Sequence, residues 1–282
     1  MTRPLRGRSF AVGITGCFLH PPVAKCAILD VLRPVSGKEA GQFLFFERVV
    51  KMRKSNESKN IRLEEMSAFF NRRSESYDEV HVSMIKDGAE SKRVVADFLP
   101  EGTGNLLDIG IGTGLELEAI FRRFPDMRVT GIDIAAEMMA KIKEKYPQKD
   151  VTLLNMSYFD YDYKPENFDA VLSVMTLHHY THEVKTALYR RIYEAVRKGG
   201  VYIECDYMLT GKNEFVNRCR ERNLFREYDR LVSSQGLDNG LEYHFDTPCT
   251  LRNQIKMLKS AGFKKVEKLW QSGTTVLLRA KK

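Results

Sequence analysis

The run LLDIGIGTGLELE, residues 106–118, is the feature that most restricts how this chain can fold. An apolar segment ends at Asp108, and Gly110, Gly112 and Gly114 then alternate with other residues before an amphipathic segment begins. Glycine has no Cβ, so it lets the backbone turn sharply and come close to a ligand. A helix that begins behind such a loop points its free N–H groups at the bound molecule. The pattern therefore predicts a strand, a ligand-binding turn and a helix in succession.

Strand-like and helix-like segments alternate along most of the chain. The predicted strands are 105–109, 128–133, 151–155, 170–174 and 200–205. The predicted helices are 62–71, 88–99, 115–124, 135–146, 182–197 and a long polar one within 212–235. Two final strand-like runs, 264–270 and 274–280, are joined by Gln271-Ser272-Gly273, which predicts a hairpin. The alternation predicts an α/β fold with a mostly parallel sheet and helices on both faces.

A carboxylate at the end of the second predicted strand adds to the glycine pattern. Asp133 closes the segment RVTGID, and at that place a carboxylate can accept hydrogen bonds from both ribose hydroxyls of a nucleoside. A dinucleotide site would need a third glycine at position 115, where this chain has Leu115. The spacing D-x-G-x-G-x-G together with Asp133 therefore predicts a nucleoside cofactor of another kind.

These residues resemble those of the class I S-adenosylmethionine-dependent methyltransferases. The matching landmarks, in chain order, are DIGIGTG, GIDIA, FDAVLSVMTLHH, RKGG and LKSAGF. They lie between residues 108 and 263 in the order that the family uses, within a resemblance that covers residues 62–282, about 220 residues. The resemblance implies a Rossmann-like, seven-stranded, mostly parallel sheet with an antiparallel C-terminal hairpin. It also implies that the cofactor is S-adenosylmethionine.

The resemblance further implies which residues contact this cofactor. The three glycines would approach its methionyl part, Asp108 would lie near its ammonium group, and Asp133 would bind its ribose. Many members contact the adenine amino group with an acidic residue after the third strand. Here that position holds Met156 or Ser157, so backbone contacts are expected instead. The other residues carried over are Ile134 and Met138 beside the adenine, Val174 beside the methionyl group, and Tyr77 closing over the cofactor.

Three polar residues are candidates for chemistry on the methyl acceptor. His178 follows the fourth predicted strand, Asp206 ends the fifth, and His244 precedes the last helix, so all three can reach the ligand-binding edge. A histidine with an ordinary pKa could remove a proton from an acceptor, and His178 is the first choice. Capping of the next helix is the alternative role for His178. No acidic residue lies at a suitable spacing from the neighbouring histidines, so no metal site is predicted.

The N-terminal part of the chain differs in charge from the rest. Residues 1–54 carry ten basic and three acidic side chains, which is +7 of the net +8. Residues 1–55 are predicted to be a poorly ordered basic extension, with a targeting sequence as the alternative. Residues 56–282 are predicted to form the methyltransferase domain, with 209–248 as an insertion that caps the acceptor site. Five scattered cysteines and the lack of an 18-residue apolar run predict a reduced, cytoplasmic protein without a membrane partner.

The leading functional hypothesis is methyl transfer to an oxygen or nitrogen atom of a small molecule. The C-terminal segment and the LHHY…RKGG segment are also similar to carboxy-S-adenosylmethionine synthases, which act in tRNA modification. Such a synthase needs an arginine for the carboxylate on its cofactor, and Arg226 is the candidate. A cofactor-binding regulator without catalysis is the third hypothesis. The sequence leaves the acceptor and the oligomeric state open.

Overall fold

A computed structural model describes residues 61–83 and 88–282. Contacts between residues divide the chain into residues 1–38 and 39–282, and every described residue lies in the second unit. The predicted extension, residues 1–55, lies outside the described residues.

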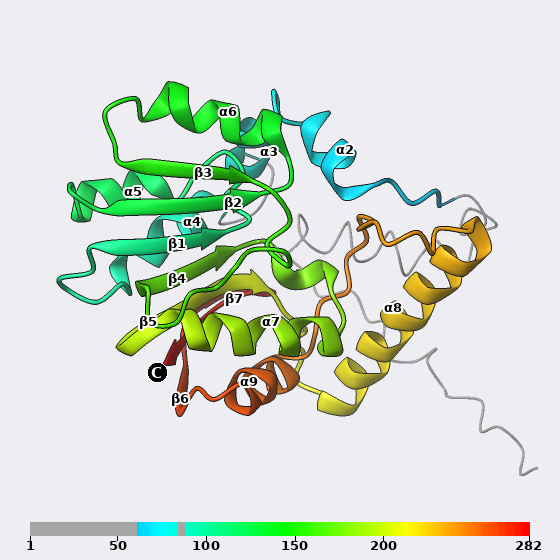
Figure 1. Cartoon of the computed structure of the whole chain (residues 1–282). Helices are drawn as coiled ribbons and strands as arrows, with labels where there is room; N and C mark the ends of the chain where they lie inside the picture. The colour runs from blue at the N-terminus through cyan, green and yellow to red at the C-terminus, as the bar shows by residue number, and fades with distance from the viewer. Residues whose placement is uncertain (1–60, 84–87) are drawn as a thin grey trace, which may run out of the picture. The chain divides into compact units, whose positions relative to one another are not determined.

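One seven-stranded sheet forms the centre of the described unit, in the order β3-β2-β1-β4-β5-β7-β6 (Figure 1). The strands are β1 (Asn105–Ile109), β2 (Arg128–Asp133), β3 (Val151–Asn155), β4 (Phe168–Val174), β5 (Val196–Tyr207), β6 (Lys265–Ser272) and β7 (Thr275–Lys281). The first five pair in parallel, and β7 runs antiparallel between β5 and β6. This arrangement confirms the predicted Rossmann-like sheet and its antiparallel C-terminal hairpin.

Helices cover both faces of the sheet. They are α2 (Met66–Asn71), α3 (Tyr77–Ser83), α4 (Gly88–Asp97), α5 (Leu117–Arg123), α6 (Ala136–Lys145), α7 (His182–Ala195), α8 (Glu214–Gln235) and α9 (Leu251–Ser260), with the 3-10 turn η2 (Leu177–His179). In Figure 1, α7 and α9 lie on one face and α4 and α5 on the other. None of the helices in the described ranges is long and apolar enough to cross a membrane.

Strand residues alternate between two hydrophobic cores, one on each face. Leu107 and Val171 belong to the core beneath α7 and α9, whereas Leu106 and Leu172 belong to the core beneath α4 and α5. Successive side chains of a strand point to opposite faces, so strands that are apolar at every position require cover on both sides. All seven residues of β4 are buried, as a central strand between two helical layers requires.

Several predicted boundaries were wrong by a few residues. The first helix begins at Met66, not at residue 62, because the Glu65 side chain accepts hydrogen bonds from the N–H groups of Ser67 and Ala68 and ends the extended segment before it. Strand β5 begins at Val196, and α7 ends at Ala195, so the predicted helix 182–197 was too long. The β6–β7 turn comprises Gly273 and Thr274, since Ser272 already pairs with Thr275.

Residues 209–248 connect β5 to α9 and contain the 22-residue helix α8. Asn213 caps its first turn and Gly236, with φ +65°, ends it. In Figure 1, α8 stands beside the sheet and does not cover either face. Its buried Leu231 packs with Leu63 and Tyr243 in a separate small core. The segment after α8 therefore returns to the carboxyl edge of the sheet.

Candidate functional site

The glycine loop after β1 has a backbone that other residues rarely adopt. The φ angles of Gly110, Gly112 and Gly114 are +69°, +53° and +66°. A Cβ on Gly110 would lie 2.3 Å from Cγ2 of Thr176, and one on Gly114 would lie 2.9 Å from Cδ1 of Leu117. At Gly110 and Gly114, glycine is required because the φ angle is positive and because a Cβ would collide with a neighbouring side chain. At Gly112, glycine is required because of the positive φ angle alone.

Asp133 holds this loop to the end of β2. Its Oδ2 accepts a hydrogen bond from the N–H of Gly112 at 2.8 Å, and its Oδ1 accepts one from the N–H of Ala135 at 2.8 Å. Burial raises the pKa of Asp133 to about 6, against the opposing effect of these backbone donors. Each carboxylate oxygen has a second lone pair for a further donor. The carboxylate therefore shapes the site and remains able to bind a hydroxyl.

A single cavity extends from the glycine loop toward η2 and α2. Of the residues predicted to contact the cofactor, those that line it are Tyr77, Gly110, Gly112, Asp133, Ile134, Met138, Ser157 and Val174. Asp108, Gly114 and Met156 lie outside its lining. Lining residues that the sequence analysis missed include Phe70, Lys92, Glu116, Tyr158, His179, Tyr180 and Glu242.

Carboxylate oxygens without a hydrogen-bond partner cluster at the glycine end. Both oxygens of Asp108 and Oε1 of Glu116 are buried and find no donor among the described residues. Lys92 Nζ lies 3.5 Å from Oε2 of Glu116. Burial, followed by the neighbouring Glu116 carboxylate, raises the pKa of Asp108 well above its usual range. Buried acceptors of this kind are costly unless paired, so this end of the cavity suits a cationic donor.

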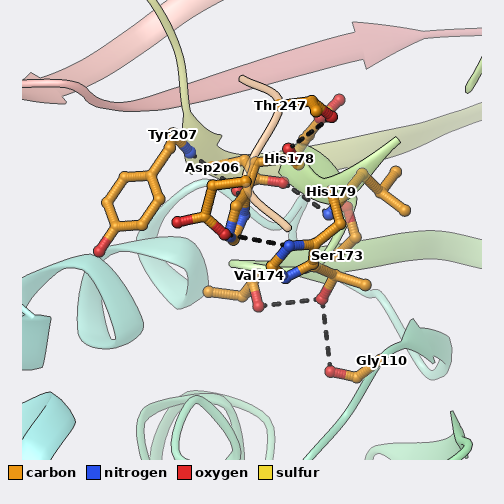
Figure 2. Close-up of polar contacts among 12 residues, drawn as sticks. Gly110, Ser173, Val174, His178, His179, Asp206, Tyr207 and Thr247 are labelled. Atoms are coloured by element: carbon orange, nitrogen blue, oxygen red, sulfur yellow. Dashed lines mark hydrogen bonds and ion pairs between the residues drawn. The ribbon is translucent and has the colours of Figure 1, made fainter. Parts of the chain in front are cut away.

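His178 lies between the carboxylates of Asp206 and Asp246, outside the cavity lining, and Figure 2 shows it beside Asp206. Its Nδ1 is 2.6 Å from Asp206 Oδ1, and its Nε2 is 3.4 Å from Asp246 Oδ1. Asp206 also accepts hydrogen bonds from the N–H groups of Leu177 and Tyr207. Burial alone would lower the pKa of His178, but Asp206 and Asp246 raise it to about 10. At neutral pH this imidazole is therefore protonated and unable to accept a proton.

The two neighbouring histidines are neutral. Burial, followed by the charge of His178, lowers the pKa of His179. Burial and the neighbouring histidines lower the pKa of His244 to about 3, and its ring stacks on Phe69 with centroids 3.5 Å apart. Of the four polar residues in this group, His178, His179, His244 and Asp206, His179 alone lines the cavity.

The structure supplies an acidic neighbour that the spacing of the histidines did not reveal. His178, His179 and Asp246 present nitrogen and oxygen atoms within 4.8 Å of one another. His182, Glu221 and Cys249 form a second such group. Because protonated His178 already bridges Asp206 and Asp246, these contacts have an explanation without a metal ion. The absence of a metal site stays a prediction.

Two chain segments form a roof over the cavity, and we define the roof as residues 63–66 and 241–246. Glu65 and Tyr243 form an isolated antiparallel bridge. The N–H of Met66 donates to the carbonyl of Glu242 at 2.8 Å, and the N–H of His244 donates to the carbonyl of Glu64 at 2.9 Å. These bonds join the chain before the sheet to the segment after α8.

Glu242 brings a carboxylate to the segment after β3, where the sequence predicted backbone contacts alone. Ser157 Oγ donates to Glu242 Oε1 at 2.7 Å, and the Tyr180 hydroxyl donates to Oε2. Glu242 is 85 residues from Ser157 in the chain, so no local pattern could have indicated this contact.

Comparison with known proteins agrees with the fold and identifies a methyltransferase domain. Residues 106–200 match a family model described as a methyltransferase domain. The carboxy-S-adenosyl-L-methionine synthase of Nautilia profundicola is 22% identical over 184 residues, covering 62% of this chain and 75% of that protein. An uncharacterized methyltransferase of Bacillus cytotoxicus is 26% identical over 127 residues, covering 45% of this chain and 58% of that protein. The chain therefore spans little more than half the length of the second relative.

Two solved structures have the same fold. Human N-acetylserotonin methyltransferase in complex with S-adenosylmethionine matches with a TM-score of 0.54 and 16% identity, over 77% of this chain and 56% of that one. Phosphoethanolamine N-methyltransferase 2 of Haemonchus contortus, also with S-adenosylmethionine, matches with a TM-score of 0.52 and 23% identity, over 72% of this chain and 44% of that one.

The seven-stranded sheet, the glycine loop and the matched domain define an α/β methyltransferase. Residues 106–200 carry a methyltransferase domain, and these findings support a class I S-adenosylmethionine-dependent methyltransferase with S-adenosylmethionine as its cofactor.

Proposed function

We propose that this protein transfers a methyl group from S-adenosylmethionine to an oxygen or nitrogen atom of a small molecule. One observation carries the proposal: a single cavity joins the glycine loop to a recess lined by Phe70, His179 and Tyr180. The lining of this cavity thus includes both residues predicted to bind the cofactor and residues of α2 and η2 that could face an acceptor.

The residues at the glycine end fit the cofactor. The unpaired oxygens of Asp108 and Glu116 suit its ammonium group, and Lys92 suits its carboxylate. Asp133 is proposed to bind the ribose hydroxyls through its free lone pairs. Ile134 and Met138 are proposed to flank the adenine. Gly110, Gly112 and Val174 would lie against the methionyl part, and Tyr77 would close over it.

Bound S-adenosylmethionine supplies an activated methyl group on a positively charged sulfur. The protein must hold the acceptor atom in line behind that methyl, at about 3–3.5 Å. We propose His179 as the general base, in place of His178, because it lines the cavity and is neutral. The acceptor forms a bond to the methyl carbon, the carbon–sulfur bond breaks, and the acceptor's proton passes to His179. His178, Asp206 and Asp246 then act by positioning the base.

Similarity to the Nautilia profundicola synthase favours carboxy-S-adenosylmethionine formation as a second candidate. That reaction needs a cation beside a carboxylate on the cofactor. The predicted cation, Arg226, is exposed on α8 and does not line the cavity. Among the described lining residues, Lys92 is the one lysine or arginine, and it lies 3.5 Å from Glu116. The geometry therefore supports methyl transfer better.

Two measurements test the proposed function. Calorimetric titration with S-adenosylmethionine should show saturable binding, and Asp133→Asn should weaken it by about 10- to 100-fold, since a hydrogen bond to a charged group contributes about 1.5–3 kcal/mol. Incubation with methyl-labelled cofactor, a metabolite extract and a tRNA pool should then label a small molecule. Label in a tRNA fraction, or binding without any transfer, would instead support the tRNA-modification or the regulator hypothesis.

A further inference from the structure

The cavity lining includes one carboxylate, Glu242, which joins the segment after β3 to Tyr180 after η2 and has no opposing cation among the described side chains. Glu242 accepts hydrogen bonds from Ser157 and Tyr180, which are both neutral donors. No lysine or arginine of the described residues lies within ion-pair distance of it. The carboxylate is half-buried and lines the cavity, so its charge acts on whatever is bound there.

The charges of the other lining residues do not cancel this one. At the glycine end, Lys92 offsets Glu116, and Asp133 remains as a second carboxylate. Asp108 lies outside the lining and can only add to the negative charge, because a carboxyl group is either neutral or negative. The cofactor carries one net positive charge, from a sulfonium and an ammonium group against one carboxylate. After the cofactor has bound, one negative charge is left, and His179 adds no opposing charge because it is neutral. A positively charged acceptor would neutralise this remaining negative charge of the cavity.

Aromatic residues line the cavity together with the same carboxylate. Tyr180 donates to Glu242, and the rings of Tyr158 and Tyr180 meet edge to face with centroids 6.1 Å apart. Phe70 lines the cavity from α2. In a cavity lined by both a carboxylate and aromatic rings, an ammonium group gains from charge and from cation–π interaction. An acid or a phosphate ester would meet an uncompensated carboxylate instead.

We infer that Glu242, together with the rings of Phe70 and Tyr180, binds a cationic amino group of the methyl acceptor, so that the substrates are amines and not acids or phosphate esters. The inference rests on the proposed methyl transfer and narrows its substrate class. The bound ammonium group is the recognition group. The reacting atom is a separate hydroxyl oxygen or nitrogen of the same molecule, which loses its proton to His179 as it takes the methyl carbon from sulfur.

Three probes that differ at one end test this inference. All three probes have a phenol hydroxyl and a side chain of similar length. Tyramine ends in an ammonium group, 4-propylphenol in a methyl group and 3-(4-hydroxyphenyl)propionate in a carboxylate group. Each is titrated calorimetrically into protein saturated with S-adenosylhomocysteine. Tyramine should bind at least about tenfold more tightly than 4-propylphenol, and the carboxylate probe should bind most weakly.

The variant Glu242→Gln keeps the size of the side chain and removes its charge. It should reduce tyramine affinity by about tenfold, leave 4-propylphenol affinity unchanged, and keep cofactor affinity within about threefold. The control Glu183→Gln removes an equal charge from an exposed position on α7 and should alter none of these values. Cofactor binding by each variant also reports that the cavity is folded.

The inference is overturned if no probe binds, or if the neutral or acidic probe binds as tightly as tyramine. It is also overturned if Glu242→Gln weakens cofactor binding while the preference for tyramine over the other probes stays unchanged. The last result would assign Glu242 to the adenine amino group. Failure of the proposed function is a separate result, because the wild-type protein would then bind neither S-adenosylmethionine nor S-adenosylhomocysteine.

Discussion

The two ends of the cavity are built in different ways. The glycine end comes from neighbouring stretches of chain, the loop after β1 and the end of β2, and its backbone is fixed by positive φ angles and by Asp133. The acceptor end is assembled from α2, η2 and the segment after α8, which are joined by side-chain contacts and two backbone hydrogen bonds of the roof. Local geometry thus fixes the proposed cofactor site, whereas long-range contacts fix the proposed acceptor site.

If local geometry fixes the cofactor end, one added methyl group should destroy it. Gly110→Ala places a Cβ 2.3 Å from Thr176 Cγ2 at a φ of +69°. The strain and the collision together should lower the free energy of unfolding by about 2–5 kcal/mol and abolish measurable cofactor binding. Chemical denaturation and calorimetric titration check both.

Gly102→Ala is the matched control, since Gly102 has a φ of +75° and nothing within 4 Å of the added Cβ. It should cost about 1–2 kcal/mol of stability and leave cofactor affinity unchanged. Equal effects of the two substitutions would show that the close approach of Thr176 does not matter.

At the acceptor end, loss of the base should affect catalysis without affecting the cofactor. His179→Gln should lower kcat by about 10²- to 10⁴-fold, because general-base catalysis contributes that much, and leave the Kd for S-adenosylmethionine unchanged. His244→Gln, which changes a neutral histidine outside the cavity lining, should have a much smaller effect on kcat. A larger loss from His244→Gln than from His179→Gln would contradict the assignment.

The pairing of His178 with Asp206 and Asp246 predicts a dependence of stability on pH. The folded pKa of His178, about 10, is higher than the unfolded value of about 6.5, so its contribution is fully present below about pH 6.5 and is lost as the pH rises through 10. The difference in thermal midpoint between the wild type and His178→Gln should therefore be largest near pH 6 and shrink toward pH 10. A difference that is constant over this range would refute the pairing.

The smallest effect is expected on α8. Arg226→Ala should leave cofactor affinity and methyl transfer within about twofold of the wild type, because this side chain is exposed and outside the cavity lining. Loss of activity in this variant would revive the carboxy-S-adenosylmethionine hypothesis.

The sequence predicted the parts of the molecule that depend on local chemistry. The sequence identified Gly110, Gly112 and Asp133 as site residues, because a tight turn and a strand end require particular residue types at particular spacings. The alternation of strands and helices likewise predicted the sheet. Helix ends were missed where a side chain such as Glu65 caps the backbone.

The acceptor end could not be predicted in the same way. Glu242 meets Ser157 and Tyr180 only because the chain folds back after α8. Choosing between His178 and His179 required knowing that Asp246 lies beside them, and a sequence without the fold does not show which of two adjacent residues faces a cavity. Glu116 had a local signal, since it follows the third glycine of the loop by two residues.

The position of the roof also indicates where the backbone can tolerate cleavage or new chain ends. Residues 238–240 are exposed, Gly240 has a φ of +77°, and the stretch lies between α8 and the roof segment 241–246 without belonging to any strand of the sheet. Exposed loop tips of this kind are where proteins tolerate nicking and circular permutation. New chain ends introduced there would leave all seven strands paired, and a fluorophore attached to them would report on the roof from outside the cavity.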